Sequence, residues 1–528
     1  MSKPSLATLS EYRWAIAAVA LVGTLALKST LNKRKRNPRG LPPPPGPKGL
    51  PLLDNLLQIP QENAWKVYNE WRKEYGDIIY LEALGQPIMI LNSLEDCVAL
   101  FDKRATNYSD RAEIPAVDMM SLTWSFALMS YGASWRSHRR AFHQFLNHTQ
   151  VPQYRPVLEQ ETRMFLQRLL QDPKEFMEDI RYLFGSIIMR ISYGVSDFNY
   201  NKSLIIDGEN LIEGFAELVV PGRLLVNNFP ALRHVPDWFP GTGWKRELAR
   251  LRQLSKRVLN KPFDDAKERM KDGSDKEEYP SIAKGLLDKI RTSNLSPAEA
   301  LEQETIGRNT AALSYIAGAD TSVSSAQALF FALVTHPHVQ ARAQAELESV
   351  IGKDRLPKPE DVERLPYIQA IVKETGRWHV IVPFAIPHLS REDDEYKGYF
   401  IPAGTVVMPN SWAILHDPET FPDPFTFKPE RYLTPDGELD TSMLDPEVAA
   451  FGYGRRICPG RHLSNESLAL MAASVLSVFD LAPPKNEKGE PMEIKLETLA
   501  DSLVAKPLPF QCEIKPRSEA HVSLLLHS

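Results

Sequence analysis

The chain has 528 residues, with 43% hydrophobic content and a formal net charge of −5. It can therefore bury a large core, and no basic excess points to nucleic acid as a partner. Its three cysteines, Cys97, Cys458 and Cys512, are too few and too scattered for a disulfide framework or a cysteine zinc cage. This sparse use of cysteine is typical of a compartment that faces the reducing cytosol.

An apolar stretch near the N-terminus predicts a transmembrane anchor over residues 14–31. Its length of about 18 residues is close to the short limit for crossing a bilayer. A basic cluster follows it, so the positive-inside rule places residues 1–13 in the lumen and the rest in the cytosol. Basic residues after the stretch count against the alternative, a cleaved signal peptide. We therefore expect a single-pass protein of the endoplasmic reticulum, in contact with membrane lipid.

Residues 32–51 are basic and Pro-rich, which predicts a semi-rigid hinge behind the anchor. A ligand for a Pro-binding module is the alternative, and the position next to the anchor argues against it. Residues 52–515 contain no linker, repeat or charge block long enough to divide them. We therefore expect one large domain there, followed by a short C-terminal tail over residues 516–528.

Helical patterns dominate this domain, and strand-like segments are few and short. The predicted helices cover residues 156–170, 305–335, 338–351 and 462–478. The predicted strands cover residues 78–81, 88–91, 398–401 and 405–408. The expected fold class is therefore mostly α with small β-sheets (α+β).

The segment FGYGRRICPG, from Phe451 to Gly460, carries the strongest chemical signal. Its glycines let the backbone approach a neighbour closely, and its single cysteine comes just before a helical pattern. A thiolate at a helix N-terminus is stabilised by the helix dipole and nearby N–H groups. A cysteine that binds a metal alone favours haem iron over zinc. A lone cysteine is more often structural, so the interpretation of Cys458 as a ligand depends on the whole ten-residue pattern.

A second motif, AGADTS at residues 317–322, lies inside the long apolar pattern. Gly318 in mid-helix costs about 1 kcal/mol relative to Ala, so it needs a compensating role. Asp320 and Thr321 need partners or a function in such an apolar stretch. Taken alone, this hexapeptide fits equally well an ordinary core helix whose polar side chains are hydrogen-bonded. The presence of Cys458 further along the chain favours the functional interpretation.

Two further motifs place polar residues on one face of a predicted helix. Glu374 and Arg377 are three residues apart. This spacing alone indicates an ordinary exposed ion pair on a helix, which stabilises the helix by about a few tenths of a kcal/mol. Trp135 and Arg139 are four residues apart, and each can donate a hydrogen bond to a carboxylate.

With these motifs, the chain resembles the cytochrome P450 family, of the microsomal eukaryotic kind, and particularly its fungal secondary-metabolism members. The matching patterns are F-x-x-G-x-R-x-C-x-G, [A/G]-G-x-[D/E]-T-[T/S], E-x-x-R and W-x-x-x-R. The resemblance covers essentially the whole chain after the anchor. It implies the P450 fold, with haem b between the long helix and the Cys458 loop.

The resemblance also implies which residues hold the haem. Cys458 is expected to be the axial iron ligand, in a loop that begins with Phe451. The expected partners of the haem propionates are Trp135, Arg139, His388 and Arg456. For His388 the alternative is an ordinary histidine in a surface loop.

Roles in proton supply and in folding are implied in the same way. Thr321 is expected to hydrogen-bond the dioxygen and Asp320 to relay protons to it, while Gly318 leaves room over the haem. A structural charge network behind the haem is expected from Glu374, Arg377 and Arg431. By analogy, the substrate is expected to contact residues 112–125, 215–239, 314–315, 380–384 and 502–504. Most of these residues are apolar, which is consistent with a hydrophobic substrate pocket and equally with ordinary core.

The implied activity is that of a monooxygenase. It inserts one oxygen atom of O2 into a lipophilic small molecule, such as a terpenoid, an indole or other aromatic, or a polyketide. The expected electron donor is NADPH–cytochrome P450 reductase, with cytochrome b5 as a further donor, because the chain has no flavin domain or G-x-G-x-x-G motif. Two alternatives stay open: a reductase-independent haem–thiolate isomerase or dehydratase, and a non-enzymatic haem sensor. The Asp320–Thr321 pair counts against the isomerase or dehydratase.

Overall fold

The structure, a computed structural model, describes residues 35–51, 53–218, 223–273, 281–499 and 503–526. The predicted anchor and lumenal segment lie outside these residues. Within the described ranges, no helix is both long enough and apolar enough to cross a membrane.

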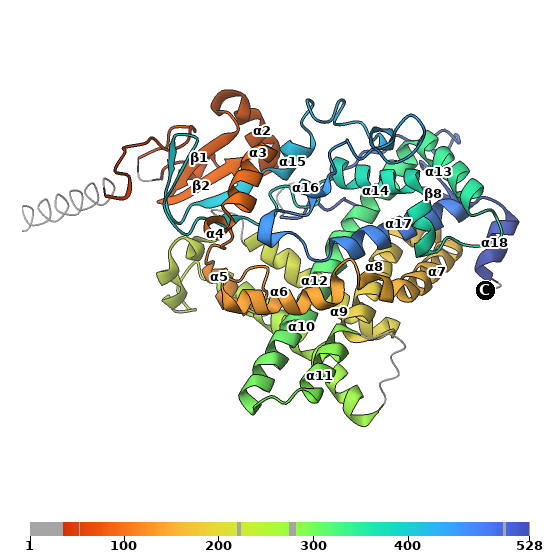
Figure 1. Cartoon of the computed structure of the whole chain (residues 1–528), viewed down its shortest axis with the longest axis horizontal. Helices are drawn as coiled ribbons and strands as arrows, with labels where there is room; N and C mark the ends of the chain where they lie inside the picture. The colour runs from red at the N-terminus through yellow and green to blue at the C-terminus, as the bar shows by residue number, and fades with distance from the viewer. Residues whose placement is uncertain (1–34, 52, 219–222, 274–280, 500–502, 527–528) are drawn as a thin grey trace, which may run out of the picture.

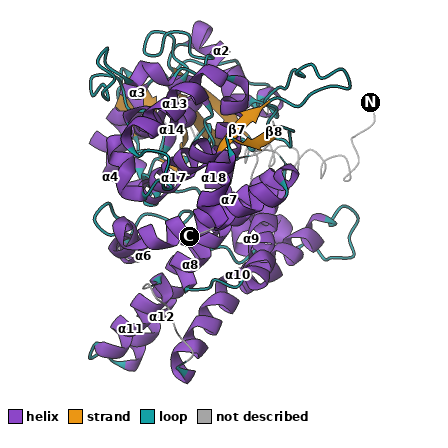
Figure 2. Ribbon diagram, turned by 90° about the vertical axis from the view of Figure 1, so that its right-hand side faces the viewer, coloured by secondary structure: helices purple, strands orange, loops and turns teal. Residues whose placement is uncertain are grey.

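Helices make up most of the described chain, as predicted, and the sheets are small (Figures 1 and 2). The helices are α2 (Ala64–Tyr75), α3 (Leu94–Cys97), α4 (Ala105–Tyr108), α5 (Pro115–Met119), α6 (Ala133–Leu146), α7 (Arg155–Gln171), α8 (Phe176–Tyr193), α9 (Phe198–Leu218), α10 (Trp244–Asp272), α11 (Ile282–Thr292), α12 (Pro297–Thr335), α13 (Pro337–Val350), α14 (Pro366–Trp378), α15 (Ser411–Leu415), α16 (Glu447–Ala450), α17 (Arg461–Val478) and α18 (Glu519–Leu526). The strands are β1 (Ile78–Ala83), β2 (Gln86–Leu91), β3 (His388–Leu389), β4 (Asp394–Tyr396), β5 (Tyr399–Ile401), β6 (Val406–Pro409), β7 (Phe479–Ala482) and β8 (Glu513–Pro516). The predicted fold class, mostly α with small sheets, is confirmed.

The four predicted helices correspond to α7, α12, α13 and α17. The longest, α12, begins at Pro297, earlier than the predicted start at residue 305. Ser296 caps it, because its hydroxyl accepts from the Glu299 N–H while the Glu299 carboxylate accepts from the Ser296 N–H. This capping box sits among polar residues, so the apolar pattern alone did not reveal the first turns.

The main sheet joins two distant parts of the chain in the order β1-β2-β6-β3. β1 and β2 are antiparallel, whereas β2 and β6 are parallel, with Met89 opposite Val407. All four predicted strands form, three of them in this sheet and the fourth as β5, which pairs with β4. The pair β7–β8 was not predicted, because β7 continues directly from the apolar pattern of α17.

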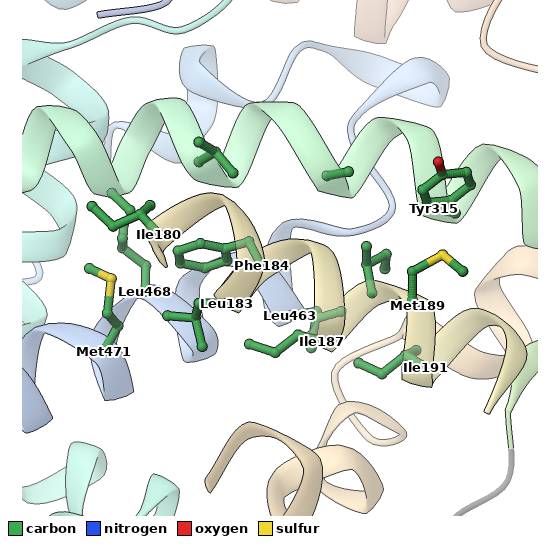
Figure 3. Close-up of a cluster of buried hydrophobic side chains, with 14 of the residues drawn as sticks. Ile180, Leu183, Phe184, Ile187, Met189, Ile191, Tyr315, Leu463, Leu468 and Met471 are labelled. Carbon is green, nitrogen blue, oxygen red and sulfur yellow. The ribbon is translucent and has the colours of Figure 1, made fainter. Parts of the chain in front are cut away.

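The core is built around α12, which packs against α6, α8, α9 and α17. Figure 3 shows Leu183, Phe184 and Ile187 of α8 in one buried cluster with Leu463 and Leu468 of α17, beside α12. Most α12 side chains are buried, so this helix is apolar on nearly all sides, as expected for a helix inside a large core.

The predicted hinge and tail both contact the body where they are described. Arg36 Nε donates to Asp393 Oδ2 over 2.8 Å, and Arg39 pairs with Glu395, so the basic segment lies against the β4–β5 hairpin. At the other end, Leu525 of α18 is fully buried in the core. Figure 1 shows α18 at the end of the body opposite to α2, β1 and β2.

Candidate functional site

Cys458 lies in the loop that leads into α17, as the sequence predicted. Its N–H donates to the Phe451 carbonyl over 2.8 Å, which closes the loop. Burial raises the pKa of the thiol, while the N–H groups of Gly460 and Arg461 and the charge of Arg139 act to lower it. The thiol is thus partly buried at a helix N-terminus, where donors and positive charge favour a thiolate.

Gly454 explains why this loop needs glycine. Its φ is +54°, a left-handed conformation, and a Cβ there would overlap the carbonyl oxygen of Phe101. Any other residue would therefore be strained and would push the loop away from the neighbouring segment.

Two predicted cofactor residues, Arg139 and Arg456, lie beside the Cys458 loop. Arg139 Nη2 donates to the Ile457 carbonyl over 2.6 Å. Arg456 donates to the carbonyls of Ser109 and Met129 over 2.8 and 2.7 Å. Burial lowers the pKa of Arg139 and brings that of Arg456 down to about 10. These pKa values mean that the site holds positive charge in a poorly solvated place.

Arg111 is a third guanidinium at this site and is buried, whereas Arg139 and Arg456 are partly buried; the sequence did not predict it. It donates to the carbonyls of Ala127, Ile386 and Pro387 over 2.9 to 3.0 Å. Burial, and then the charge of Arg456, lower its pKa well below the usual value. Arg111 belongs to no recognisable motif; only the fold brings its loop to this site.

Among the described residues, none of these three guanidiniums forms an ion pair with a carboxylate. Their hydrogen bonds go to backbone carbonyls, which carry only partial charge. Buried charges are ordinarily paired, so Arg111, Arg139 and Arg456 form a site suited to an anionic group. We call these three residues the arginine cluster.

His388 is buried next to the arginine cluster, so the alternative of a surface histidine is wrong. Its Nδ1 lies 2.6 Å from the Tyr108 carbonyl oxygen, and its ring centroid is 4.2 Å from that of Phe101. Burial, and then the charge of Arg111, lower its pKa well below the usual value. The ring is therefore neutral beside these cations, with Nδ1–H donating to Tyr108.

Trp135 is also buried at this site. Its indole ring lies 4.6 Å from the guanidinium of Arg456 and 5.1 Å from the ring of Tyr131. Within the described part of the chain, the indole N–H has no hydrogen-bond acceptor. A buried indole N–H usually has one, so Trp135 offers a donor beside the arginine cluster.

On α12, the predicted motif forms an accessible strip in an otherwise buried stretch. Ala317 is exposed, and Gly318 and Thr321 are partly exposed, while Ile316, Ala319 and Ser322 are buried. Thr321 Oγ1 donates to the Ala317 carbonyl over 2.8 Å. α12 packs against both α6, which carries Arg139, and α17, which follows Cys458. The strip therefore belongs to the helix that adjoins both halves of the site.

Gly318 has a packing reason in this structure. A Cβ at this position would lie 3.0 to 3.2 Å from Ile188, so the glycine lets α8 approach α12 closely. The expected room over the haem stays a prediction, since this contact alone explains a mid-helix glycine.

Asp320 and Thr321 make no hydrogen bond to each other. The Asp320 side chain is almost fully buried, and its Oδ1 lies 3.4 Å from Lys506 Nζ. The predicted acid and alcohol are thus adjacent in sequence but face different neighbours.

Two residues predicted to line the substrate pocket belong to the core instead. Ser314 is buried against Ser192 of α8, with the two hydroxyls 2.9 Å apart, and Tyr315 is fully buried, its hydroxyl donating to the Leu204 carbonyl of α9. Polar groups on a buried helix often satisfy each other across helix contacts. Ser502 and residues 219–222, from the other predicted pocket segments, lie outside the described residues.

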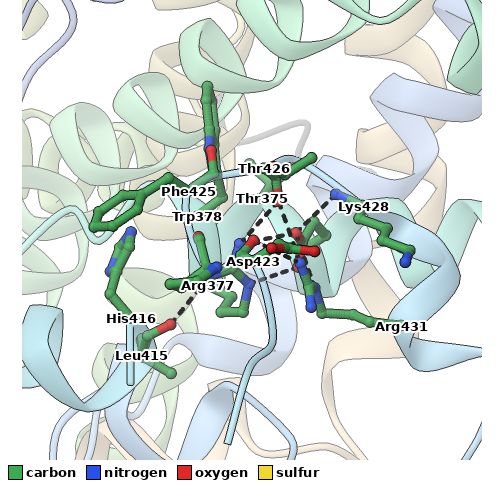
Figure 4. Close-up of polar contacts among 12 residues, drawn as sticks. Thr375, Arg377, Trp378, Leu415, His416, Asp423, Phe425, Thr426, Lys428 and Arg431 are labelled. Carbon is green, nitrogen blue, oxygen red and sulfur yellow. Dashed lines mark hydrogen bonds and ion pairs between the residues drawn. The ribbon is translucent and has the colours of Figure 1, made fainter. Parts of the chain in front are cut away.

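The structure brings Glu374, Arg377 and Arg431 into one network, and Figure 4 shows Arg377 and Arg431 within it. Arg377 donates to both Glu374 oxygens over 2.7 and 2.8 Å, and Arg431 Nε lies 3.0 to 3.1 Å from both. Arg377 also donates to the carbonyls of Leu415 and Pro424. The side chains of Glu374 and Arg377 are completely buried, so this pair is far from surface decoration.

These features define a class: a mostly helical protein with one cysteine at a helix N-terminus, beside buried cations that need an anion. Comparison with known proteins gives the family. A family model described as Cytochrome P450 matches residues 44–514. The chain therefore belongs to the cytochrome P450 family, which confirms the predicted fold, the haem b cofactor and the enzyme class of P450 monooxygenase.

Curated relatives agree over nearly their whole length. Cytochrome P450 monooxygenase COX1 from Coprinopsis cinerea is 53% identical over 513 residues, covering 97% of this chain and 98% of the relative. Cytochrome P450 monooxygenase COX2 from the same fungus is 42% identical, over 99% and 97% of the two chains. Tryptamine 4-monooxygenase from Psilocybe cyanescens is 37% identical, over 90% and 93%.

The residues of the site fit haem b. The group needs one thiolate for its iron, and Cys458 is a single cysteine with donors aimed at its sulfur. It also carries two propionates, which match the arginine cluster and the indole N–H of Trp135 in charge and donor type.

The buried charge network can be tested on stability. Replacing Glu374 with Gln removes the carboxylate and leaves the guanidiniums of Arg377 and Arg431 buried without a counter-charge. We expect Glu374→Gln to lower the free energy of unfolding by about 3–5 kcal/mol, measured from urea unfolding curves. Glu247→Gln is the matched control, because Glu247 pairs with Arg250 at the same spacing on an exposed face. If both substitutions lowered the free energy of unfolding by the same small amount, the structural role of Glu374 would be contradicted.

Proposed function

We propose that this P450 inserts one oxygen atom of O2 into a lipophilic small molecule, with Cys458 as the axial ligand of haem iron. The observation that carries this proposal is the arginine cluster, one buried and two partly buried guanidiniums without an ion-paired carboxylate, beside a cysteine in the loop that leads into α17. Haem bound there supplies O2 activation, and a thiolate ligand favours O–O cleavage.

The protein residues have separate tasks in this proposal. The N–H groups of Gly460 and Arg461 would help to stabilise a Cys458 thiolate bound to iron, and the Phe451 carbonyl fixes its loop. Arg111, together with the predicted residues Trp135, Arg139, His388 and Arg456, binds the propionates. His388 is neutral with Arg111 beside it, and an added carboxylate would favour its protonated, donating form.

Proton supply belongs to α12. The hydroxyl of Thr321 lies on the accessible strip, so it can donate to a dioxygen-derived oxygen and then regain a proton. Asp320, the next residue towards the N-terminus, is the acid that would replace this proton. Gly318 keeps α8 against this part of α12. An acid and an alcohol in this position favour oxygen chemistry over the isomerase or dehydratase alternative.

The proposed substrate class is supported by the apolar residues of the expected pocket and by the name of one relative. Residues on the accessible side of the expected pocket include Ile114, Ile381, Val382 and Leu503, all partly exposed and apolar. The name of one relative, tryptamine 4-monooxygenase, supports an indole as a candidate substrate class for this protein. We propose a terpenoid, indole or polyketide of secondary metabolism, to be identified by product analysis of microsomes fed a panel of these classes.

The proposed setting is the endoplasmic reticulum membrane, with residues 14–31 as a single anchor and the body in the cytosol. P450 enzymes generally receive electrons from a separate redox partner, and NADPH–cytochrome P450 reductase is the proposed one here. Its docking face would surround the Cys458 loop, where Arg136, Arg140 and Arg455 are exposed.

The ligand assignment has a direct test. We expect Cys458→Ala to abolish the thiolate-type reduced-CO spectrum and reductase-dependent O2 consumption, because it removes the thiolate that the proposal assigns to iron, and the neighbouring Cys97 is fully buried against Tyr453. Absorption spectra of membranes that contain equal amounts of wild type and variant provide the measurement. Cys512→Ala, a partly exposed cysteine elsewhere, is the control and should keep the wild-type spectrum. A Cys458→Ala protein with an unchanged spectrum would contradict the assignment of Cys458 as the iron ligand.

The docking face can be tested by charge reversal. We expect Arg136→Glu to slow reductase-dependent turnover by about tenfold at low salt, because it replaces an attractive charge with a repulsive one. The difference from wild type should shrink as ionic strength rises. Lys488→Glu, in an exposed loop between β7 and β8, should leave turnover unchanged. Salt-independent rates, equal for all three proteins, would argue against this face.

A further inference from the structure

Lys506 connects the buried acid of α12 to the protein surface. Its Nζ lies 3.4 Å from Asp320 Oδ1 and 3.2 Å from Glu213 Oε1 of α9. The side chains of Asp320, Lys506 and Glu213 are 6%, 17% and 55% exposed. The three groups therefore form a line from a buried carboxylate, through a mostly buried ammonium, to a carboxylate in solvent.

The backbone next to Lys506 is held firmly in place. The N–H of Ala505 donates to the Ile381 carbonyl over 2.7 Å, and the Ala505 carbonyl accepts from Ser324 Oγ of α12 over 3.1 Å. Ser324 follows Asp320 by one helical turn on the same helix. The position of Lys506 relative to Asp320 is thus fixed by contacts of the preceding residue, and not only by the ion pair.

Charge around Lys506 keeps it protonated. Burial alone would lower its pKa, but Asp320, Glu213 and Glu209 outweigh burial and raise it. Glu209 has a cation of its own, since Arg181 Nε donates to it over 3.0 Å. In the described chain, Lys506 is the one cation within ion-pair distance of Asp320, and Asp320 Oδ1 has no hydrogen bond. Asp320 therefore depends on Lys506 for its counter-charge.

We propose that Lys506 is a positioning residue for Asp320 and connects it to Glu213, so that protons enter the site through this ion-paired line. This inference rests on the proposed monooxygenase function, because that reaction consumes protons at Thr321. It goes beyond the motif, since Lys506 lies in a loop far along the chain from Asp320.

The proton movement balances without a further reactant. Water at the surface, or the protonated Glu213 carboxyl through water, supplies one proton to the Asp320 carboxylate, while Lys506 stays an ammonium and holds the two carboxylates in line. Asp320 then passes its proton toward Thr321 and returns to its ionised form. One proton has moved inward, and every group on the line is restored.

The ion-paired line is tested first without turnover, by acetylating lysines of the haem-containing protein with acetic anhydride and measuring each site by mass spectrometry. We expect Lys506 to react several-fold faster in Asp320→Asn and Glu213→Gln than in wild type, since losing a carboxylate lowers its pKa. Lys515, which pairs with Glu513 over 2.9 Å on β8, should react equally in all three proteins. Unchanged labelling of Lys506 would overturn the proposal.

Its role in proton supply is tested by coupling efficiency, the product formed per NADPH consumed, with the panel compound that wild type oxidises fastest. We expect Lys506→Met to lower coupling on the order of tenfold and to increase the solvent isotope effect in D2O. The reduced-CO spectrum should stay normal. Lys506→Arg, which keeps the charge, should recover most of the coupling, and the control Lys515→Met should match wild type.

The outcomes separate this proposal from the proposed function. Wild type that consumes no O2 with the reductase refutes the proposed function, whatever Lys506 does. Wild type that turns over normally, with Lys506→Met equally coupled and unchanged in D2O, refutes only the inference about Lys506. A loss of coupling that Lys506→Arg does not restore would also overturn it, because it would show a need for the lysine's shape and not its charge.

Discussion

Positive charge beside Cys458, with no carboxylate in ion-pair contact, is the constraint on which the site depends. Arg111, Arg139 and Arg456 come from three separate segments, yet Arg111 is buried, the other two are partly buried, and all donate to backbone carbonyls instead of carboxylates. Bringing cations together in a poorly solvated place is unfavourable unless an anion joins them. The family's cofactor supplies two carboxylates, so haem binding and the packing of these segments stabilise each other.

The long helix α12 serves both the core and the reaction. Most of its side chains pack against α6, α8, α9 and α17, which fixes the helix in place. At Ala317 and Thr321 the same helix becomes accessible, and this contrast makes a rigid surface for chemistry. Asp320 is paired with Lys506, whereas Thr321 bonds the Ala317 carbonyl. The proposed proton supply to Thr321 therefore depends on the neighbours of Asp320.

Behind the site, the network of Glu374, Arg377 and Arg431 provides stability instead of reactivity. Its charges are balanced within the protein, unlike those of the arginine cluster. Arg377 also donates to the carbonyls of Leu415, at the end of α15, and of Pro424, in the loop that follows, so it ties both to α14. One buried pair therefore organises the long stretch of loops between β6 and α17.

The sequence predicted features whose partners are close along the chain. Cys458 in its glycine loop, the i and i+3 pair Glu374 and Arg377, and the helix that carries Thr321 are local patterns. Arg431 and His388 needed the family resemblance, because they reach the site from distant segments. Arg111 and Lys506 matched no pattern, since only tertiary contacts bring their loops to the site. Ser314 and Tyr315 were assigned to the pocket because spacing on a helix does not tell which neighbour covers each face.

The central claim, that Cys458 is the iron ligand, is tested most directly by X-ray absorption at the iron edge of the purified protein. We predict one sulfur atom in the first coordination shell of iron, and its loss in Cys458→Ala. A first shell of nitrogen and oxygen alone in wild type, or a sulfur that persists in the variant, would contradict the account.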